Sequence, residues 1–139
     1  MDPRNFLTTA NELANKTSAT AADLRTAISR AYYAAFNTGL EHLAKLNQAW
    51  ENLNHGEVAR YLSNSGNSHI ETAGKNLERL HSLRITADYR MRDPRLENKD
   101  TVIFWIRRTR NIVDLLDQHC HGSAVANGIR EYERKVGSR

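Results

Sequence analysis

The sequence predicts an all-α protein that folds as an up-and-down antiparallel bundle of four to five helices. Only two prolines occur, Pro3 and Pro94, and alanine and leucine are plentiful between them, so little interrupts helix formation. Apolar residues also recur at intervals of three and four, as they do on the buried face of a packed helix. A chain of 139 residues can bury one core but not two, so residues 1–139 are expected to form a single domain.

The first half of the chain contains two predicted helix starts. Pro3 suits a first helical turn, where its missing N–H is not needed, and this helix is expected to reach about Lys16. Thr20 and Asp23 form an approximate capping box, in which each residue satisfies a backbone amide of the other. The box predicts a long second helix that ends at about Leu46.

A polar segment around Trp50 separates this helix from a short one expected at residues 57–62, and a turn follows at 63–68. The next helix is expected to start near His69. Its apolar residues recur with helical spacing before the pattern skips position 84, and they are Ile70, Ala73, Leu77, Leu80 and Ala87. This spacing is typical of one face of a helix packed in a bundle.

Residues 93–99 form an expected loop, and Asp100 is the predicted cap of a further helix. The apolar seam of that helix comprises Val102, Ile106, Thr109, Val113 and Leu116, flanked by Ile103, Trp105 and Ile112. Gly122 and Ser123 are expected to end it. A last amphipathic helix is predicted at about 124–136, docked on the bundle or on a partner subunit.

The net charge and the type of basic residue limit the functions that this sequence can be expected to have. The 20 basic and 16 acidic side chains give a net charge of +4, which is too low for a dedicated duplex-binding protein. Fifteen of the 20 basic residues are arginine, whose planar fork binds phosphate or carboxylate with two donors. This composition permits phosphate recognition, and compositional bias of the genome explains it equally well.

Cys120 is the only cysteine, so no internal disulfide can form, and a cytoplasmic location is expected. No long apolar run follows the N-terminus, which predicts no signal peptide. No segment approaches the ~18 apolar residues of a membrane-spanning helix, so we expect no membrane association.

The strongest local anomaly is Arg84, because its position in the apolar stripe requires a hydrophobic residue. Asp88 lies one turn later and His81 one turn earlier on the same face, so the three side chains form a polar patch. The functional interpretation is a phosphate-binding and proton-transfer site, in which Arg84 stabilises charge and His81 or Asp88 moves protons. The structural interpretation is an Arg–Asp pair that fixes helix register.

Two sequence motifs resemble those of the HEPN family of helical-bundle proteins. They are Ser-Arg-Ala-Tyr-Tyr-Ala-Ala-Phe at residues 29–36 and Arg-x-x-Ala-Asp-Tyr at residues 84–89. The resemblance covers roughly residues 20–120, which is then the expected core, and it implies a homodimer with a polar groove at the two-fold interface. The family is linked to RNA cleavage and toxin–antitoxin pairs. Members of the matching branch often accompany a small nucleotidyltransferase, so such an enzyme or an antitoxin is an expected partner.

The usual nuclease motif of that family is absent from this sequence. HEPN ribonucleases carry an Arg followed, after four to six intervening residues, by a His, and two copies meet at the dimer interface to cleave RNA without a metal. The position that follows Arg84 after four intervening residues is Tyr89. The equivalent position for Arg110 is Leu115, and His119 comes too late, after eight intervening residues.

Aromatic residues near the patch extend the candidate site. One of Tyr32 and Tyr33 is expected to pack in the core, while the other lends its hydroxyl to Arg84 or Asp88. Arg30 is a candidate second cation for the patch, with an exposed salt bridge as the alternative. The candidates for binding nucleic acid or phosphate are therefore Arg84, Arg30, Tyr33 and Tyr89.

Two other clusters give weaker signals. Arg107, Arg108 and Arg110 are accompanied by acidic residues at 114 and 117, which is typical of a solvated charged face, with nucleic-acid contact as the alternative. The segment at 119–121 has two His and one Cys but lacks the second ligand pair of a structural zinc site. We therefore expect no metal and no other cofactor.

Three functional hypotheses follow. The favoured one is a HEPN-like RNA- or nucleotide-associated module of a toxin–antitoxin or defence system, which acts as a dimer with a nucleotidyltransferase partner. The second is a metal-independent endoribonuclease that uses Arg84 with His81 or Asp88. The third is a structural dimerisation protein without an RNA role.

Overall fold

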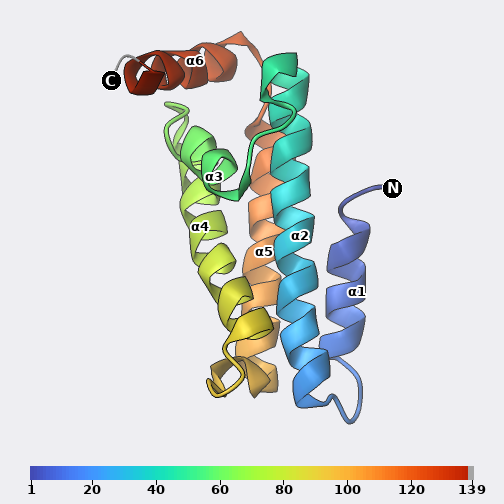
Figure 1. The fold of residues 1–139 in the computed structure, drawn as a ribbon. Helices are drawn as coiled ribbons and strands as arrows, with labels where there is room; N and C mark the ends of the chain where they lie inside the picture. The colour runs from blue at the N-terminus through green and yellow to red at the C-terminus, as the bar shows by residue number, and fades with distance from the viewer. Residues whose placement is uncertain (138–139) are drawn as a thin grey trace.

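The protein is all-helical across residues 1–137, the part of the chain that the computed structural model describes (Figure 1). This confirms the predicted all-α class, but the described residues form six α-helices rather than the four to five expected. The α-helices are α1 (Asn5–Ala14), α2 (Ala21–Leu46), α3 (His55–Ser63), α4 (Ser68–Tyr89), α5 (Lys99–His119) and α6 (Ser123–Gly137), with short 3-10 helices η1 (Gln48–Trp50) and η2 (Arg95–Glu97) in the connections. No helix within residues 1–137 is both long and apolar enough to cross a membrane.

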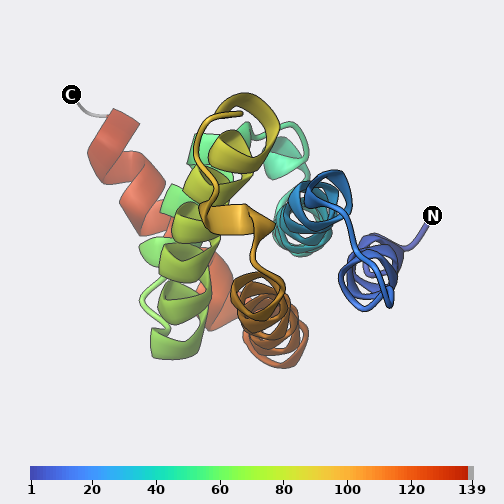
Figure 2. The same ribbon diagram turned by 90° about the horizontal axis from the view of Figure 1, so that it is seen from below.

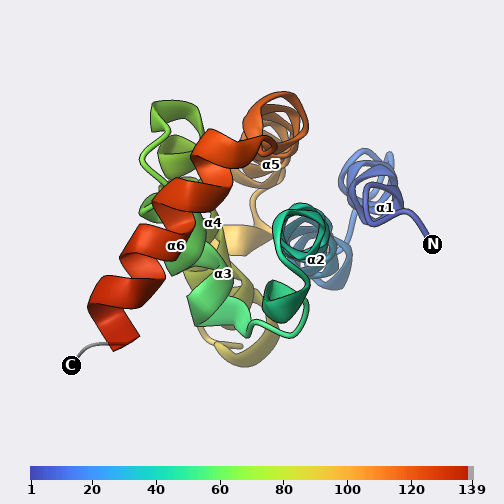
Figure 3. The same ribbon diagram turned by 90° about the horizontal axis from the view of Figure 1, so that it is seen from above.

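Three long helices form the body of the fold. α2, α4 and α5 pack against one another, and α1 lies on the outer side of α2, where it also contacts α5 (Figures 1 and 2). The helices α1, α2, α4 and α5 run alternately up and down, as predicted for an antiparallel bundle. α3 packs on α4, and α6 crosses the end of the bundle next to α3 (Figure 3).

Small side chains on α2 allow neighbouring helices to approach closely. Ala27, Ala31 and Ala34 are fully buried in one apolar cluster with residues of α1 and α5. Ala35 faces a second cluster, which includes residues of α3, α4 and α6. The two faces of α2 are therefore both buried, and α2 is the central helix of the fold.

Capping residues explain where the helices begin. At α2 the predicted capping box is present: the Asp23 amide donates to Thr20 Oγ1 at 3.1 Å, and the Thr20 amide donates to Asp23 Oδ2 at 3.0 Å. The predicted start of the short helix is wrong. This helix begins at His55 rather than at 57, because Asn54 and Glu57 form a second capping box.

Two further helices have other bounds than predicted. α5 begins at Lys99, because Asn98 and not Asp100 is its cap, and Asn98 accepts from the Thr101 amide at 3.0 Å. α1 begins at Asn5, so that Pro3 precedes the helix instead of lying in its first turn, and it ends at Ala14, two residues before the predicted end. Neither difference moves a residue of the predicted polar patch.

Arg25, near the start of α2, ties the end of α4 to the loop that follows it. The residue is only 8 % exposed. Its guanidinium donates to the carboxylate of Glu97, with Nη2 at 2.7 Å. The backbone carbonyl oxygens that it also reaches are those of Thr86, Ala87, Arg90, Met91 and Asp93. One buried side chain thereby fixes the path of the chain from α4 towards η2.

The last helix, α6, is docked on the bundle through both polar and close contacts. Glu133 Oε2 accepts from Trp50 Nε1 at 3.1 Å and from the Tyr61 hydroxyl at 2.8 Å. Gly128 lies so close to the backbone of Ser65 that an added Cβ would be 1.9 Å from the Ser65 carbonyl oxygen. α6 therefore fastens η1 and α3 to the end of the fold.

Candidate functional site

Arg84 lies near the C-terminal end of α4 among aromatic rings, and it is 9 % exposed. Its guanidinium carbon is 5.6 Å from the ring centroids of both Tyr32 and Tyr33 and 6.0 Å from that of Tyr89. Asp88 is its ion-pair partner within residues 1–137, with 3.5 Å between Nη1 and the carboxylate. The charge at position 84 is thus held mainly by aromatic faces, which attract cations.

The pairing of Arg84 leaves donors unused. The carboxylate of Asp88 is shared, because its Oδ2 also accepts from Ser29 Oγ at 3.2 Å. The Nε of Arg84 is buried and has no hydrogen-bond partner in the described part of the chain. Burial of a charged group with incomplete hydrogen bonding costs stability. A purely structural role therefore explains the contacts of Arg84 less well than it explains those of Arg25.

Arg30, the predicted second cation, belongs to the same stack of side chains. Its guanidinium carbon is 5.6 Å from the Phe6 ring centroid and 5.3 Å from that of Tyr33. The Tyr33 ring therefore contacts the guanidinium groups of both Arg30 and Arg84. No salt bridge of Arg30 is found within residues 1–137, so the predicted alternative of an exposed ion pair is not observed there.

The two adjacent tyrosines have different surroundings, and one expectation about them is wrong. Tyr32 is fully buried, as expected for one of the pair. Its hydroxyl lies 2.5 Å from Nδ1 of His55. Tyr33, the other tyrosine, is partly buried and contacts Arg84 through its ring, and within residues 1–137 its hydroxyl makes no hydrogen bond to Arg84 or Asp88. The two tyrosines thus supply aromatic faces to the site, and the buried hydroxyl of Tyr32 forms a hydrogen bond with a histidine.

His55 and His81 form a stacked pair beside Tyr32. Their ring centroids are 5.4 Å apart and their planes differ by 1°. His81 lies 5.1 Å from the Tyr32 ring, and His55 lies 4.3 Å from the Phe36 ring. His81 comes from α4, one turn before Arg84, as predicted, whereas His55 is the first residue of α3. Two imidazoles from different helices therefore meet at the edge of the Arg84 site.

Burial and positive charge favour the neutral form of both imidazoles. Burial lowers the pKa of His55 below its ordinary value of 6.5, and the charge of Arg84 adds to the shift. Burial is also the main cause of the lowered pKa of His81, followed by His55 and Arg84. Burial raises the pKa of the Tyr32 hydroxyl, which therefore stays protonated, and it shares a hydrogen bond with Nδ1 of His55.

The resulting site lies where α2, α4 and the start of α3 meet. It contains two guanidinium groups, two half-buried imidazoles, a shared carboxylate and several aromatic faces. Guanidinium groups bind phosphate, aromatic faces stack on nucleobases, and imidazoles exchange protons near neutral pH. These are the chemical capacities that recognition of an RNA or a nucleotide requires.

Sequence reasoning missed His55. The residue follows a helix cap, Asn54, and precedes the Glu57 that completes the capping box, so only the exact start of α3 would have shown that it opens a helix. Its partners in the site are distant in sequence, at positions 32 and 81. No periodic pattern within α3 therefore indicates that His55 faces α2 and α4.

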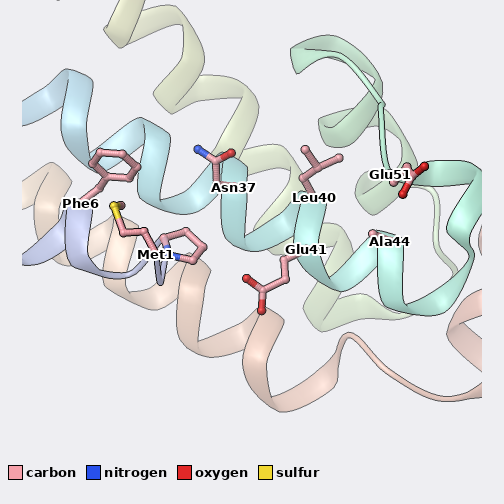
Figure 4. A pocket seen from close by; sticks show the side chains of 8 residues that line it. Met1, Phe6, Asn37, Leu40, Glu41, Ala44 and Glu51 are labelled. Carbon is pink, nitrogen blue, oxygen red and sulfur yellow. The ribbon is translucent and has the colours of Figure 1, made fainter.

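A separate hollow of about 580 Å³ lies between the N-terminal segment and the second half of α2 (Figure 4). Met1 and Phe6 line one side, and Leu40 lines the other. Its charged side chains are acidic, Glu41 and Glu51, which disfavours a phosphate ligand there. The phosphate-binding capacity of the described surface is therefore not in this hollow.

The other predicted clusters contribute no side chain to the site. The arginines at 107, 108 and 110 are exposed on α5. Asp117, expected near Arg110, instead accepts from Arg4 and pairs with His42. Within residues 1–137 no group of three or more His, Cys, Asp or Glu side chains is arranged to hold a metal ion.

A scan against protein-family models, a search of curated proteins and a search of solved structures each found no match to this chain. We therefore infer function from the geometry of the site and from the two sequence motifs.

Proposed function

We propose that this protein is a HEPN-like module that binds the phosphate of an RNA or a nucleotide at the site formed by Arg84, Arg30, Tyr33 and Tyr89. In this proposal it acts as a homodimer in a toxin–antitoxin or defence system, with a nucleotidyltransferase or antitoxin partner. The family, the dimer and the partner are suggested by the motif resemblance. The phosphate site is suggested by the side chains around Arg84.

The observation that carries the proposal is the incomplete pairing of Arg84. Its guanidinium makes no hydrogen bond within residues 1–137, and its one ion pair, with Asp88, is long at 3.5 Å. Three tyrosine rings hold the group in place without using its N–H donors. A phosphate that reaches the Nη donors would supply the hydrogen bonds that the protein does not.

Binding of a labelled RNA oligonucleotide, measured by fluorescence anisotropy and by competition with adenosine monophosphate, tests the proposal. Arg84→Met removes the charge and keeps an unbranched side chain against the rings. We expect binding to weaken about tenfold or more, because hydrogen bonds to a charged group contribute about 1.5–3 kcal/mol. Arg108→Met is the matched control, since Arg108 also lies over an aromatic ring, at 5.2 Å, but outside the site. Equal affinity of the wild type and the Arg84 variant would contradict the proposal.

The stacked pair of His55 and His81 favours a second candidate function, metal-independent RNA cleavage. In such a step the 2′-hydroxyl oxygen attacks the phosphorus and its proton passes to a neutral imidazole. The proton taken up by the imidazole pair is then given to the departing 5′ oxygen, which leaves a 2′,3′-cyclic phosphate. Arg84 would stabilise the charge that develops on the phosphate oxygens.

Cleavage of a single-stranded RNA in the presence of a chelator tests this second candidate. Wild-type protein is expected to release products that end in a cyclic phosphate, and His81→Ala and His55→Ala should each abolish their formation. His69→Ala is the control, because His69 lies at the other end of α4 and stacks on His119. If the wild-type protein cuts no RNA, the enzyme hypothesis fails while phosphate binding remains testable.

The proposed dimer and partner are tested separately. Light scattering after size-exclusion chromatography measures the mass of the purified protein against the 15.8 kDa of one chain. Purification of a tagged chain from its own cells identifies any protein that binds it. A monomer without a bound nucleotidyltransferase or antitoxin would remove this part of the proposal.

A further inference from the structure

The segment that leaves α4 exposes two large side chains. Tyr89 is 70 % exposed and Met91 is 62 % exposed, although most large apolar residues of the fold are buried. Together with Arg90, Arg92 and Asp93 they line an open hollow of about 480 Å³. Neighbouring exposed apolar side chains on a folded domain often mark a binding surface.

The backbone beneath these side chains is fixed. Arg25 Nη2 donates to the carbonyl oxygens of Arg90, Met91 and Asp93, at 3.2, 3.3 and 2.5 Å. The Arg90 amide also donates to the Thr86 carbonyl at 3.0 Å, which closes the last turn of α4. Tyr89 and Met91 are therefore presented by an ordered backbone, and their exposure is not the result of a frayed helix end.

The exposed segment is also positively charged. Arg90 and Arg92 are exposed, and neither has an ion pair within residues 1–137. The acidic residue of the segment, Asp93, is engaged by Arg95 at 2.7 Å. Two guanidinium groups without an ion pair in the described part of the chain therefore line the same hollow as an exposed aromatic ring. This arrangement favours a polyanion with planar groups over an acidic or neutral apolar ligand.

This segment is continuous with the Arg84 site, because the Tyr89 ring lies 6.0 Å from the guanidinium carbon of Arg84. A base stacked on the outer face of Tyr89 would therefore lie next to a phosphate held by Arg84. Stacking requires an unpaired base, since the faces of bases in a duplex are covered by their neighbours.

We propose that residues 89–92 extend the Arg84 site into a track for single-stranded RNA, with a base stacked on Tyr89 and successive phosphates contacted by Arg90 and Arg92. This inference rests on the proposed phosphate-binding function and names its ligand. It sets single-stranded RNA apart from a free nucleotide, which cannot occupy the whole track, and from a duplex, which cannot stack on Tyr89.

The test compares the binding of a labelled single-stranded RNA, the same sequence as a duplex, and adenosine monophosphate. We expect the single strand to bind most tightly. Tyr89→Ala should weaken that binding about five- to 100-fold, as removal of one stacking ring does, whereas Tyr89→Phe should keep it. Phe104→Ala is the matched control, because Phe104 is an aromatic residue that is 49 % exposed on α5 with an arginine over its ring.

Salt dependence tests the two arginines separately. Arg90→Ala and Arg92→Ala should each reduce the slope of log affinity against log salt concentration by about 0.7, the value for one phosphate contact on a single strand. If Tyr89→Ala and both arginine variants bind like the wild type while Arg84→Met loses binding, this inference fails and the phosphate site stands. If the duplex binds as tightly as the single strand, the inference also fails. If Arg84→Met binds like the wild type, the proposed function fails, whatever the Tyr89 variants do.

Discussion

Two arginines of this fold are buried to nearly the same extent but differ in how many of their N–H donors form hydrogen bonds. Arg25 is 8 % exposed and Arg84 is 9 % exposed. All three guanidinium nitrogens of Arg25 donate to protein oxygens, among them the carboxylate of Glu97. Arg84 has a single long ion pair and three tyrosine rings. The difference lies in the donors that remain unused, not in depth of burial.

The comparison separates a structural arginine from a candidate binding arginine. A buried guanidinium whose donors are all satisfied stabilises the backbone that surrounds it. A buried guanidinium with free donors loses its hydration, and its contacts with the protein offset that loss of free energy only in part. Arg25 therefore stabilises the fold, and the unused donors of Arg84 are the feature on which the proposed phosphate site rests.

The largest effect is expected from Arg25→Ala. The change leaves the carboxylate of Glu97 without its guanidinium partner and removes a donor from five backbone carbonyl groups, of which those of Thr86 and Arg90 keep a backbone partner. The free energy of unfolding should therefore fall by about 3–5 kcal/mol. Urea denaturation followed by circular dichroism measures this loss. Arg95→Ala, which removes an exposed pair with Asp93, is the control and should leave the midpoint unchanged. A small loss for Arg25→Ala would show that loop contacts elsewhere hold the end of α4.

Arg84→Met should give a smaller loss of stability, about 1 kcal/mol or less, because methionine retains the packing against the rings and Asp88 still accepts from Ser29. The same urea titration measures it beside the binding assay. Measuring both stability and RNA binding on the same variant separates a structural role of Arg84 from a phosphate-binding role. A loss of about 3–5 kcal/mol without any separate loss of RNA binding would make Arg84 a structural residue like Arg25.

Tyr32→Phe probes the surroundings of Arg84 without touching its charge. The variant keeps the buried ring and removes the hydroxyl that shares a hydrogen bond with Nδ1 of His55. We expect a loss of about 1 kcal/mol in the free energy of unfolding, the usual contribution of one hydrogen bond. The His55 ring resonances in an NMR spectrum should shift as well. An unchanged spectrum would mean that Tyr32 does not position His55 in solution.

The smallest expected effect is a change in the free energy of unfolding with pH that arises from the two histidines beside Arg84. Both His55 and His81 have pKa values below 6.5 in the folded state, so below that pH the unfolded chain binds more protons. The free energy of unfolding should therefore fall as the pH drops from about 7.5 to about 5.5, and their contribution above that window is constant. The double variant His55→Gln with His81→Gln should flatten this slope. A slope that is unchanged in the double variant would place its origin in other groups.

The sequence predicted the fold well because the fold depends on local patterns. Helical spacing of apolar residues located α4 and α5, and Thr20 with Asp23 located the start of α2. Errors occurred where two polar residues competed as a cap. Asn98 precedes Asp100, and both types cap helices, so the choice depends on which side chain reaches a free amide.

The site was predictable only in its local part. Arg84 was found because a charge interrupts an apolar stripe, and Asp88 and His81 follow from helical spacing. His55 and Arg25 were missed for the same physical reason: their partners lie more than twenty residues away in sequence, and no helical period connects them. Tertiary packing, which brings α3 and the end of α4 onto α2, decides the role of both residues.

The docking of α6 has a consequence for the histidine pair. Glu133 holds Trp50 and Tyr61, which lie on either side of His55 in the sequence. The position of one imidazole in the site is therefore coupled to a helix that contributes no residue to it. A fragment that ends before α6 would retain Arg84 and the tyrosines of α2 but would lose the anchor of the segment that carries His55. The segment that carries His55 is thus anchored by α6, whereas the guanidinium groups of Arg30 and Arg84 are carried by α2 and α4.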